Sequence, residues 1–319
     1  MKKSIPMLFA SLLMCAGLSA CNTPNSNGDK LQIVTTIFPE YDWTREILGK
    51  NPANAEVTML LDNGVDLHSY QPSAQDLIKI SDCDLFIYVG GESDEWVERA
   101  LEQSTNKDMV VINLLESLGD KVKEEEVKEG MEGHDHDHDH EEESHDHEEE
   151  EEEHDHEEES HDHDHDHEHE EEYDEHVWLS LKNAASICET IEKGIEKIDP
   201  TNAETYKGNL ASYKEKLSTL DANYKAAVDA SAIKTLVFGD RFPFRYMVDD
   251  YGLDYYAAFV GCSAETEASF ETIVFLAGKI DELGLHSVLT IEGNDHRIAE
   301  TVVANTTAKN QKILTMDSL

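Results

Sequence analysis

Short apolar runs alternate with amphipathic stretches along most of this chain, and this pattern limits its fold more strongly than any other feature. Residues 31–122 contain LQIVTTIF, AEVTMLL, CDLFIYVG and DMVVINL, and residues 231–319 contain KTLVFG, YYAAFVG, SVLTIE and QKILTM. The stretches between these runs are long enough for helices, so each strand reaches the next by a crossover and the strands pair in parallel. We therefore predict an α/β fold with two parallel-sheet lobes, an N-terminal lobe over 31–122 and a C-terminal lobe over 231–319.

A single long helix over 202–230 is predicted to join the two lobes. Its apolar side chains recur at three- and four-residue spacing, which places them on one helical face. These side chains are Tyr206, Leu210, Tyr213, Leu217, Leu220 and Tyr224. Such a helix spans about 45 Å, and the helical segment 176–201 before it completes the N-terminal lobe. Two lobes joined in this way enclose a cleft, and the ligands of such sheets bind near the carboxyl ends of the strands.

Two serines stand where helices of the N-terminal lobe are expected to begin. Ser73 and Ser93 are each followed by acidic or amide side chains suited to a first helical turn. A serine hydroxyl at this position accepts a hydrogen bond from a free backbone N–H. We expect both serines to be N-caps.

The segment 123–175 is expected to be a disordered insert that collects metal ions. Thirteen of the 17 histidines lie between His134 and His169, mostly in alternation with aspartate. Between Glu129 and Glu175 there are 28 acidic residues and no lysine or arginine, so like charges repel and little apolar surface can be buried. Neutral imidazole binds borderline divalent cations, and dense carboxylates concentrate them. A solvated acidic linker with incidental histidines is the alternative.

The N-terminus resembles an export signal followed by a lipid-attachment site. After the basic start, the uncharged run 5–20 has 16 residues, fewer than the ~20 needed to span a bilayer. The sequence Leu-Ser-Ala-Cys that ends at Cys21 resembles a bacterial lipoprotein box, in which the cysteine is lipidated. We predict a signal peptide over 1–20, a lipidated Cys21 and a flexible tether over 21–30. An ordinary signal peptide with an unmodified Cys21 is the alternative.

Charge and cysteine content exclude two other classes of function. The formal net charge is −45, of which 28 negative charges fall between Glu129 and Glu175, and so acidic a chain is not expected to bind nucleic acid. Apart from the N-terminal cysteines, the chain contains Cys83, Cys188 and Cys262, which allow at most one disulfide of unassigned pairing. None of the three lies in a C-x-x-C pair, so a redox role or a thiolate metal site is not expected.

Two histidines outside the insert lie in polar segments between predicted elements. His68 lies in the loop between AEVTMLL and the helix expected after Ser73, and His176 directly follows the insert. Imidazole is a common zinc ligand, but a single histidine is more often an ordinary core or surface residue. From their spacing alone, both readings stay open.

Five motifs occur in the order and spacing of a known receptor family. TTIFPEYDW, VDLHSYQPS, YVGGESDEW, EHVWLSLKNA and AETYKGNLASYKEKL resemble the metal-binding solute receptors of bacterial ABC importers, in the zinc and manganese class. The resemblance extends over 31–319. It implies two α/β lobes joined by one long rigid helix, with a metal site in the cleft between the lobes. It also implies that His68 and His176 bind the metal through neutral imidazole nitrogens.

The other two ligands that the resemblance implies are less well matched. The family has a histidine or glutamate in a segment similar to F-H-D-A-F, whereas this chain reads Phe-Gly-Asp-Arg-Phe, so Asp240 is the nearest carboxylate. Pairing with Arg241 or capping of the next helix is the alternative for Asp240. Asp317 matches the fourth ligand of the family. Glu292 matches another acidic residue of the family, and for Glu292 a structural role and coordination of the metal are both open. The family usually continues past this aspartate with one more helix, so a trimmed lobe or a truncated chain is expected.

The expected ligands are compatible with either Zn²⁺ or Mn²⁺ as the bound ion. Two imidazoles and two carboxylates suit Zn²⁺ in a near-tetrahedral site, and they suit Mn²⁺ if the carboxylates chelate. The histidine-rich insert favours Zn²⁺, because clusters of imidazole bind it more tightly than Mn²⁺.

We therefore expect a monomeric, lipid-anchored zinc receptor on the extracytoplasmic face of the cell membrane, which delivers Zn²⁺ to an ABC permease and is not an enzyme. A manganese receptor of the same class is the first alternative. A metal-storage or adhesin lipoprotein and a metal-dependent hydrolase are the others, although the hydrolase motif H-E-x-x-H does not occur in the chain.

Overall fold

The computed structural model describes residues 30–62, 65–132, 172–263, 266–293 and 295–318. The predicted signal peptide, the lipidation site Cys21, nearly all of the tether and the histidine-rich part of the insert, 133–171, lie outside the described residues. In the part of the chain that is described, no helix combines the length and the apolarity needed to cross a bilayer.

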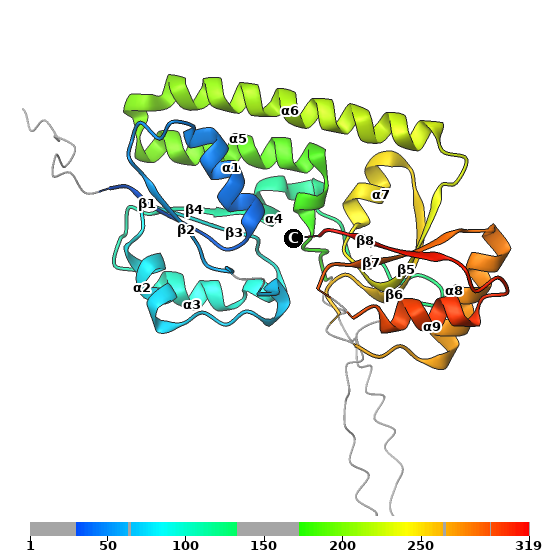
Figure 1. Ribbon diagram of the computed structural model, residues 1–319. Coiled ribbons are helices and arrows are strands. Elements are labelled where there is room, and N and C mark those ends of the chain that lie inside the picture. The colour runs from blue at the N-terminus through cyan, green and yellow to red at the C-terminus, as the bar shows by residue number, and fades with distance from the viewer. Residues whose placement is uncertain (1–29, 63–64, 133–171, 264–265, 294, 319) are drawn as a thin grey trace, which may run out of the picture.

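The N-terminal lobe contains a parallel sheet with helices on both faces. The strands pair in the order β2-β1-β3-β4. They are β1 (Gln32–Thr35), β2 (Glu56–Met59), β3 (Leu85–Tyr88) and β4 (Val110–Asn113). Helices α1 (Phe38–Leu48) and α5 (Leu181–Ile198) lie on one face, and α2 (Ala74–Asp82) and α3 (Trp96–Glu102) lie on the other (Figure 1). The short helix α4 (Leu114–Leu118) follows β4.

The C-terminal lobe repeats this arrangement with strand order β6-β5-β7-β8, again with every pair parallel. Its strands are β5 (Thr235–Phe242), β6 (Asp254–Val260), β7 (Ser287–Ile291) and β8 (Lys312–Met316). Helices α8 (Phe270–Leu283) and α9 (Arg297–Asn305) pack on one face of the sheet, and α7 (Arg245–Tyr251) lies on the opposite side. The predicted fold of two parallel-sheet α/β lobes is confirmed.

Helix α6 (Ala203–Ala230) runs along both lobes, as predicted (Figure 1). Its N-terminal part, as far as Leu217, packs on the N-terminal lobe, where Tyr206 and Leu217 are buried. Its second half reaches the C-terminal lobe, where the Tyr251 hydroxyl of α7 donates to Asp221 at 3.0 Å. One continuous helix is therefore attached to both lobes, which limits how far they can separate.

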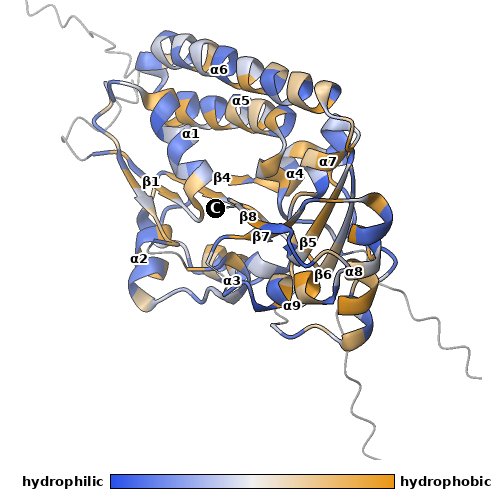
Figure 2. Ribbon diagram, turned by 45° about the vertical axis from the view of Figure 1, so that its right-hand side comes forward, coloured by the Kyte–Doolittle hydropathy of each residue, from blue (hydrophilic) through white to orange (hydrophobic). Residues whose placement is uncertain are grey.

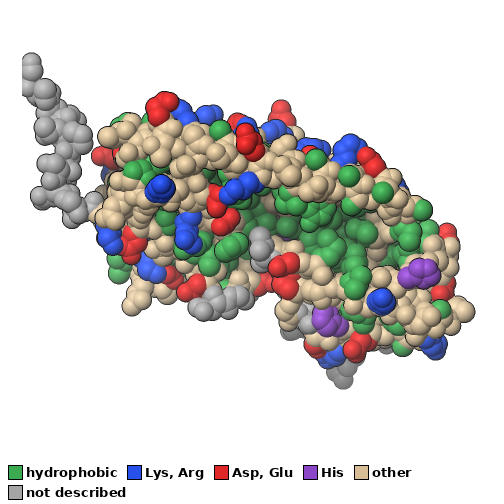
Figure 3. Space-filling view, turned by 45° about the horizontal axis from the view of Figure 1, so that its top comes forward, with side chains coloured by type: hydrophobic (Ala, Val, Ile, Leu, Met, Phe, Trp, Pro, Cys, Tyr) green, Lys and Arg blue, Asp and Glu red, His purple; other side chains and the backbone are tan. Residues whose placement is uncertain are grey.

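The predicted apolar stripe of α6 is only partly covered by the lobes. Leu220 and Tyr224 of the stripe remain exposed. Many residues of α6 are hydrophilic, in contrast to the hydrophobic strands of both sheets (Figure 2). Hydrophobic side chains gather in a hollow below α6 in the space-filling view (Figure 3).

Both ends of the expected insert, 123–175, belong to the folded protein. Glu124 and Tyr173 form an antiparallel bridge, and Glu132 forms a parallel bridge with Phe259 of β6. These backbone bonds provide the ordering contacts that the acidic composition did not reveal. The expected disorder is therefore wrong for the described residues at the two ends.

Replacing Tyr246 with Phe should destabilise the protein by about 1–3 kcal/mol, because a buried donor and acceptor lose their partner. The buried Tyr246 hydroxyl accepts the Lys123 N–H at 3.0 Å and donates to the Asp174 carbonyl at 2.8 Å. It therefore fastens both ends of the insert to α7. Denaturant unfolding measures the change, with Tyr224→Phe at an exposed position as the control. Equal stability of the two variants would contradict this assignment.

Candidate metal centre

His68 is held in position by a short 3₁₀ helix, η1 (Leu67–Ser69), in the loop after β2. The Asp66 carboxylate caps this turn by accepting the His68 N–H at 3.0 Å, while Leu67 is buried beneath it. The His68 ring nitrogen Nδ1 lies 2.8 Å from the Ser93 hydroxyl. The prediction that Ser73 is the N-cap of α2 is confirmed. The prediction that Ser93 is an N-cap is wrong, because Ser93 lies inside a 3₁₀ turn and its hydroxyl contacts His68.

His176 directly precedes the 3₁₀ turn η4 (Val177–Leu179) and is only 5% exposed. One Asp174 carboxylate oxygen accepts the His176 backbone N–H at 2.8 Å and lies 3.0 Å from Nδ1 of the same residue. The ring also lies beside the indole of Trp178, with centroids 5.2 Å apart. Backbone and ring are thus fixed by one buried carboxylate.

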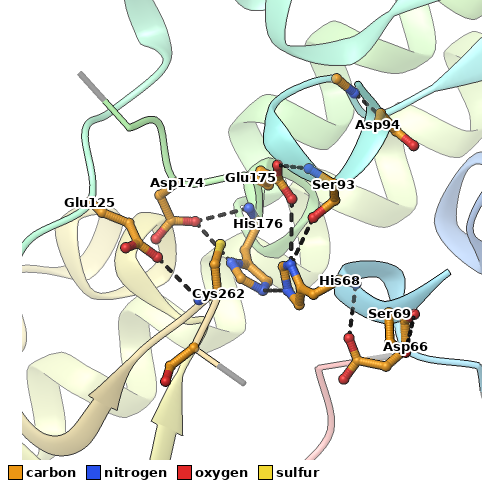
Figure 4. A network of polar contacts seen from close by, with 12 residues as sticks. Asp66, His68, Ser69, Ser93, Asp94, Glu125, Asp174, Glu175, His176 and Cys262 are labelled. Carbon is orange, nitrogen blue, oxygen red and sulfur yellow. Dashed lines mark hydrogen bonds and ion pairs between the residues drawn. The ribbon is translucent and has the colours of Figure 1, made fainter. Parts of the chain in front are cut away.

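The two imidazoles face each other through their remaining nitrogens (Figure 4). Nε2 of His68 lies 3.4 Å from Nε2 of His176. Two nitrogens bound at 2.0–2.1 Å to a tetrahedral Zn²⁺ are themselves about 3.3–3.4 Å apart. An acceptor on Nδ1 fixes the tautomer that leaves Nε2 free to bind a metal, as is usual for metal-binding histidines. The separation and the orientation of the two rings therefore both fit zinc.

A buried carboxyl group lies beside Nδ1 of His68, and a second, Asp94, acts on it electrostatically. Glu175 is 2% exposed, accepts the Ser93 N–H at 2.8 Å and approaches Nδ1 of His68 at 3.6 Å. Burial raises the pKa of Glu175 to about 7 and that of Asp94 to about 6. Gly91, at φ +81°, leaves room for the Glu175 side chain, because a Cβ atom at position 91 would collide with Oε1 of Glu175.

Cys262 lies at the same point, contrary to the expectation from sequence. Its Sγ atom and one ring nitrogen from each of His68 and His176 all lie within 4.8 Å of one another. Cys262 follows β6, so this thiol comes from the C-terminal lobe. The absence of a C-x-x-C pair did not reveal this position of Cys262, because the residues beside its thiol are two histidines that are distant in sequence. Cys83, Cys188 and Cys262 are all free thiols.

Asp240 and Asp317 are not members of this convergent group, and their roles as ligands stay predictions. Asp240 is buried, and its two carboxylate oxygens accept the backbone N–H groups of Arg241 at 2.9 Å and Ile291 at 3.1 Å. Asp317 is exposed at the end of β8. Its neighbour Ser318 donates to both carboxylate oxygens of Glu292 at 2.8 Å, which gives Glu292 a structural contact.

A cavity of about 480 Å³ opens beside His68 and is lined by residues of both lobes, Asp240 among them. At its rim, Arg241 donates to the Asp66 carboxylate at 2.8 Å across the lobe boundary. Partial burial acts to raise the pKa of Asp66, but the hydrogen bond and charge of Arg241 outweigh it and lower that pKa. This ion pair connects the loop that carries His68 to β5.

Residues 33–319 match the family described as ZnuA, the periplasmic component A of zinc-uptake complexes. The chain is 30% identical over 322 residues to the zinc-binding lipoprotein AdcA of Streptococcus pneumoniae, a match that covers 99% of this chain and 56% of AdcA. It is 28% identical over 315 residues to the high-affinity zinc uptake system protein ZnuA of Bacillus subtilis, covering 99% and 88% of the two chains. The chain therefore spans about half the length of the AdcA relatives that it matches.

Solved structures show the same fold. The Zn(II)-bound ZnuA-like domain of S. pneumoniae AdcA is similar with a TM-score of 0.63 and 25% identity, covering 91% of this chain and 88% of that one. The metal-dependent lipoprotein YcdH of B. subtilis is similar with a TM-score of 0.65 and 23% identity, over the same shares of the two chains.

Asp174→Asn should lower the affinity for Zn²⁺ by about 10–100-fold, the usual cost of losing a carboxylate that orients a metal-binding histidine. The amide no longer fixes Nδ1 of His176 as the protonated nitrogen. Calorimetric titration measures the affinity, with Asp108→Asn at an exposed loop as the control. An unchanged affinity in a folded Asp174→Asn variant would contradict the orienting role.

The stability of the protein should depend on pH through Glu40, a buried residue of α1. Burial and the charge of Asp94 raise the pKa of Glu40 well above its ordinary value. The Glu40 carboxyl group therefore binds its proton more tightly in the native state than in the unfolded chain, where the pKa of a glutamate is about 4.3. The resulting stabilisation is present below that pH and declines as the pH rises toward the pKa of the folded state.

Glu40→Gln removes this titration, so the free energy of unfolding of the unmodified protein should fall relative to the variant as the pH rises from about 4.3. Urea unfolding across this range measures the difference, with exposed Glu98→Gln as the control. A difference that does not change with pH would show that Glu40 does not titrate in this way.

Proposed function

Because the chain belongs to the ZnuA family of periplasmic zinc-uptake components, we propose that it is an extracytoplasmic receptor for Zn²⁺. The ion is the cargo of the protein and binds between the lobes through Nε2 of His68 and Nε2 of His176. The observation that carries this proposal is the 3.4 Å separation of these two nitrogens, with both Nδ1 atoms held by oxygen groups.

The receptor passes Zn²⁺ to an ABC permease in the membrane and catalyses no reaction. Membership of a family of uptake components supports both statements. A receptor must release its ion, and the cavity beside His68 gives solvent a route to the site. The protein acts as a monomer, because both lobes of one chain line that cavity.

The protein is held at the extracytoplasmic face of the membrane by lipid on Cys21. The lipoprotein box supports this attachment, as does the similarity to a relative named as a zinc-binding lipoprotein. A tether over 21–30 separates the lipid from the first described strand.

The histidine-rich segment 133–171 collects Zn²⁺. Its support is composition alone, since imidazoles and carboxylates alternate along it. A segment without a packed core loses entropy on binding an ion, so its sites are weaker than a preorganised site. Deleting it would lower the number of ions bound and leave the tight site.

Manganese is the alternative cargo. Mn²⁺ prefers oxygen-rich octahedral sites, whereas imidazole in a near-tetrahedral arrangement suits Zn²⁺. The separation of the two Nε2 atoms favours zinc.

His68→Ala or His176→Ala should each abolish tight Zn²⁺ binding, because an ion with about four ligands loses one. The measurement is competition with a zinc chelator, on the full chain and on a chain with 133–171 deleted so that weak sites do not obscure the tight one. His286→Ala, at an exposed position outside the site, is the control. Tight binding that survives both substitutions would overturn the proposed function.

A further inference from the structure

Resting on the proposed receptor function, we infer that Cys262 is the third zinc ligand, contributed by the C-terminal lobe. Its thiolate then makes the site selective for Zn²⁺ over Mn²⁺. The starting observation is the convergence of the Cys262 Sγ atom with ring nitrogens of His68 and His176, all within 4.8 Å (Figure 4).

These distances are close to those of a zinc site. With Zn–N bonds of 2.0–2.1 Å and a Zn–S bond of about 2.3 Å, tetrahedral geometry separates nitrogen and sulfur by about 3.6 Å. Starting from separations within 4.8 Å, the Sγ atom of Cys262 has to close by up to about 1.2 Å on the histidine nitrogens for all three to bind one ion. Rotation of one side chain provides a displacement of that size.

The backbone around Cys262 is built to bring the thiol to the histidines. Gly261 precedes it, and a Cβ at this position would lie only 3.0 Å from Cε1 of His176. A glycine here therefore lets the turn after β6 pass close to the imidazole without displacing the ring. The Cys262 N–H donates to the Glu125 carboxylate at 3.0 Å, which holds the turn in place.

Strand β5 also borders the cavity, but its carboxylate Asp240 lies outside the convergent group. Both carboxylate oxygens of Asp240 accept backbone N–H groups, which hold this side chain against its own sheet. A side chain at Gly239 has no room, since its Cβ would lie 2.6 Å from the Cα of Ala299. Among the described residues of the C-terminal lobe, Cys262 alone belongs to the convergent group.

The chemistry of a thiolate determines which metal this site selects. Sulfur is a soft donor that binds Zn²⁺ well, whereas Mn²⁺ prefers carboxylate, carbonyl and water oxygen. The thiol proton passes to water as the zinc–sulfur bond forms. Because the histidines come from one lobe and the thiol from the other, the bound ion also joins the two lobes.

Co²⁺ is a suitable probe, because a cobalt–thiolate bond produces a near-ultraviolet charge-transfer band that histidine and carboxylate ligands do not. The histidine-rich segment 133–171 contains no cysteine, so the full chain can be used. One equivalent of Co²⁺ should produce the band in the unmodified protein, in Cys21→Ser and in Cys83→Ser. Cys262→Ser should lose it, and its Zn²⁺ affinity should fall at least about 100-fold, with Mn²⁺ affinity nearly unchanged.

The outcomes separate this inference from the proposed function. Absence of the band in the unmodified protein overturns the inference without any variant, even if Cys262→Ser does not fold. Persistence of the band in Cys262→Ser, or Zn²⁺ affinity equal to that of the Cys83→Ser control, overturns it as well. If His68→Ala loses tight binding while Cys262→Ser retains it, the zinc receptor stands and the thiolate ligand is wrong.

Discussion

The imidazoles of His68 and His176 present Nε2 to each other because oxygen groups already hold their Nδ1 atoms. Ser93 and Glu175 lie at Nδ1 of one ring, and Asp174 lies at Nδ1 of the other. Removing these oxygens would free the rings to rotate and would lose the 3.4 Å separation that fits zinc. The arrangement is preorganised, so little ordering remains to be done when the ion binds.

The fold delivers these groups from sequence positions that are far apart. The loops after β2, β3 and β6 all begin at carboxyl ends of parallel strands, where ligands of α/β sheets usually bind. Helix α6 contacts both lobes, and the Arg241–Asp66 ion pair fastens the loop of His68 to the opposite lobe. A site formed between lobes can therefore keep its geometry while remaining open to solvent through the adjoining cavity.

Sequence reasoning succeeded where the pattern was local. Strand and helix alternation predicted both lobes and α6. Motifs in two loops pointed to His68 and His176, which the fold brings together, although their role as ligands stays a prediction. Cys262 was missed because its approach depends on how the β6 turn packs against the other lobe, which no spacing reveals. Asp240 was predicted as a ligand because it is the carboxylate nearest to the third-ligand position of the family, but sequence does not show that its oxygens accept backbone N–H groups within the C-terminal sheet.

One Zn²⁺ is proposed to bind between the two imidazoles. Anomalous scattering from crystals of the zinc-loaded protein, collected on both sides of the zinc absorption edge, locates the ion directly. We expect one strong peak about 2.0–2.1 Å from Nε2 of both His68 and His176. A strong peak bound by other residues, with these two nitrogens left without metal, would contradict the account.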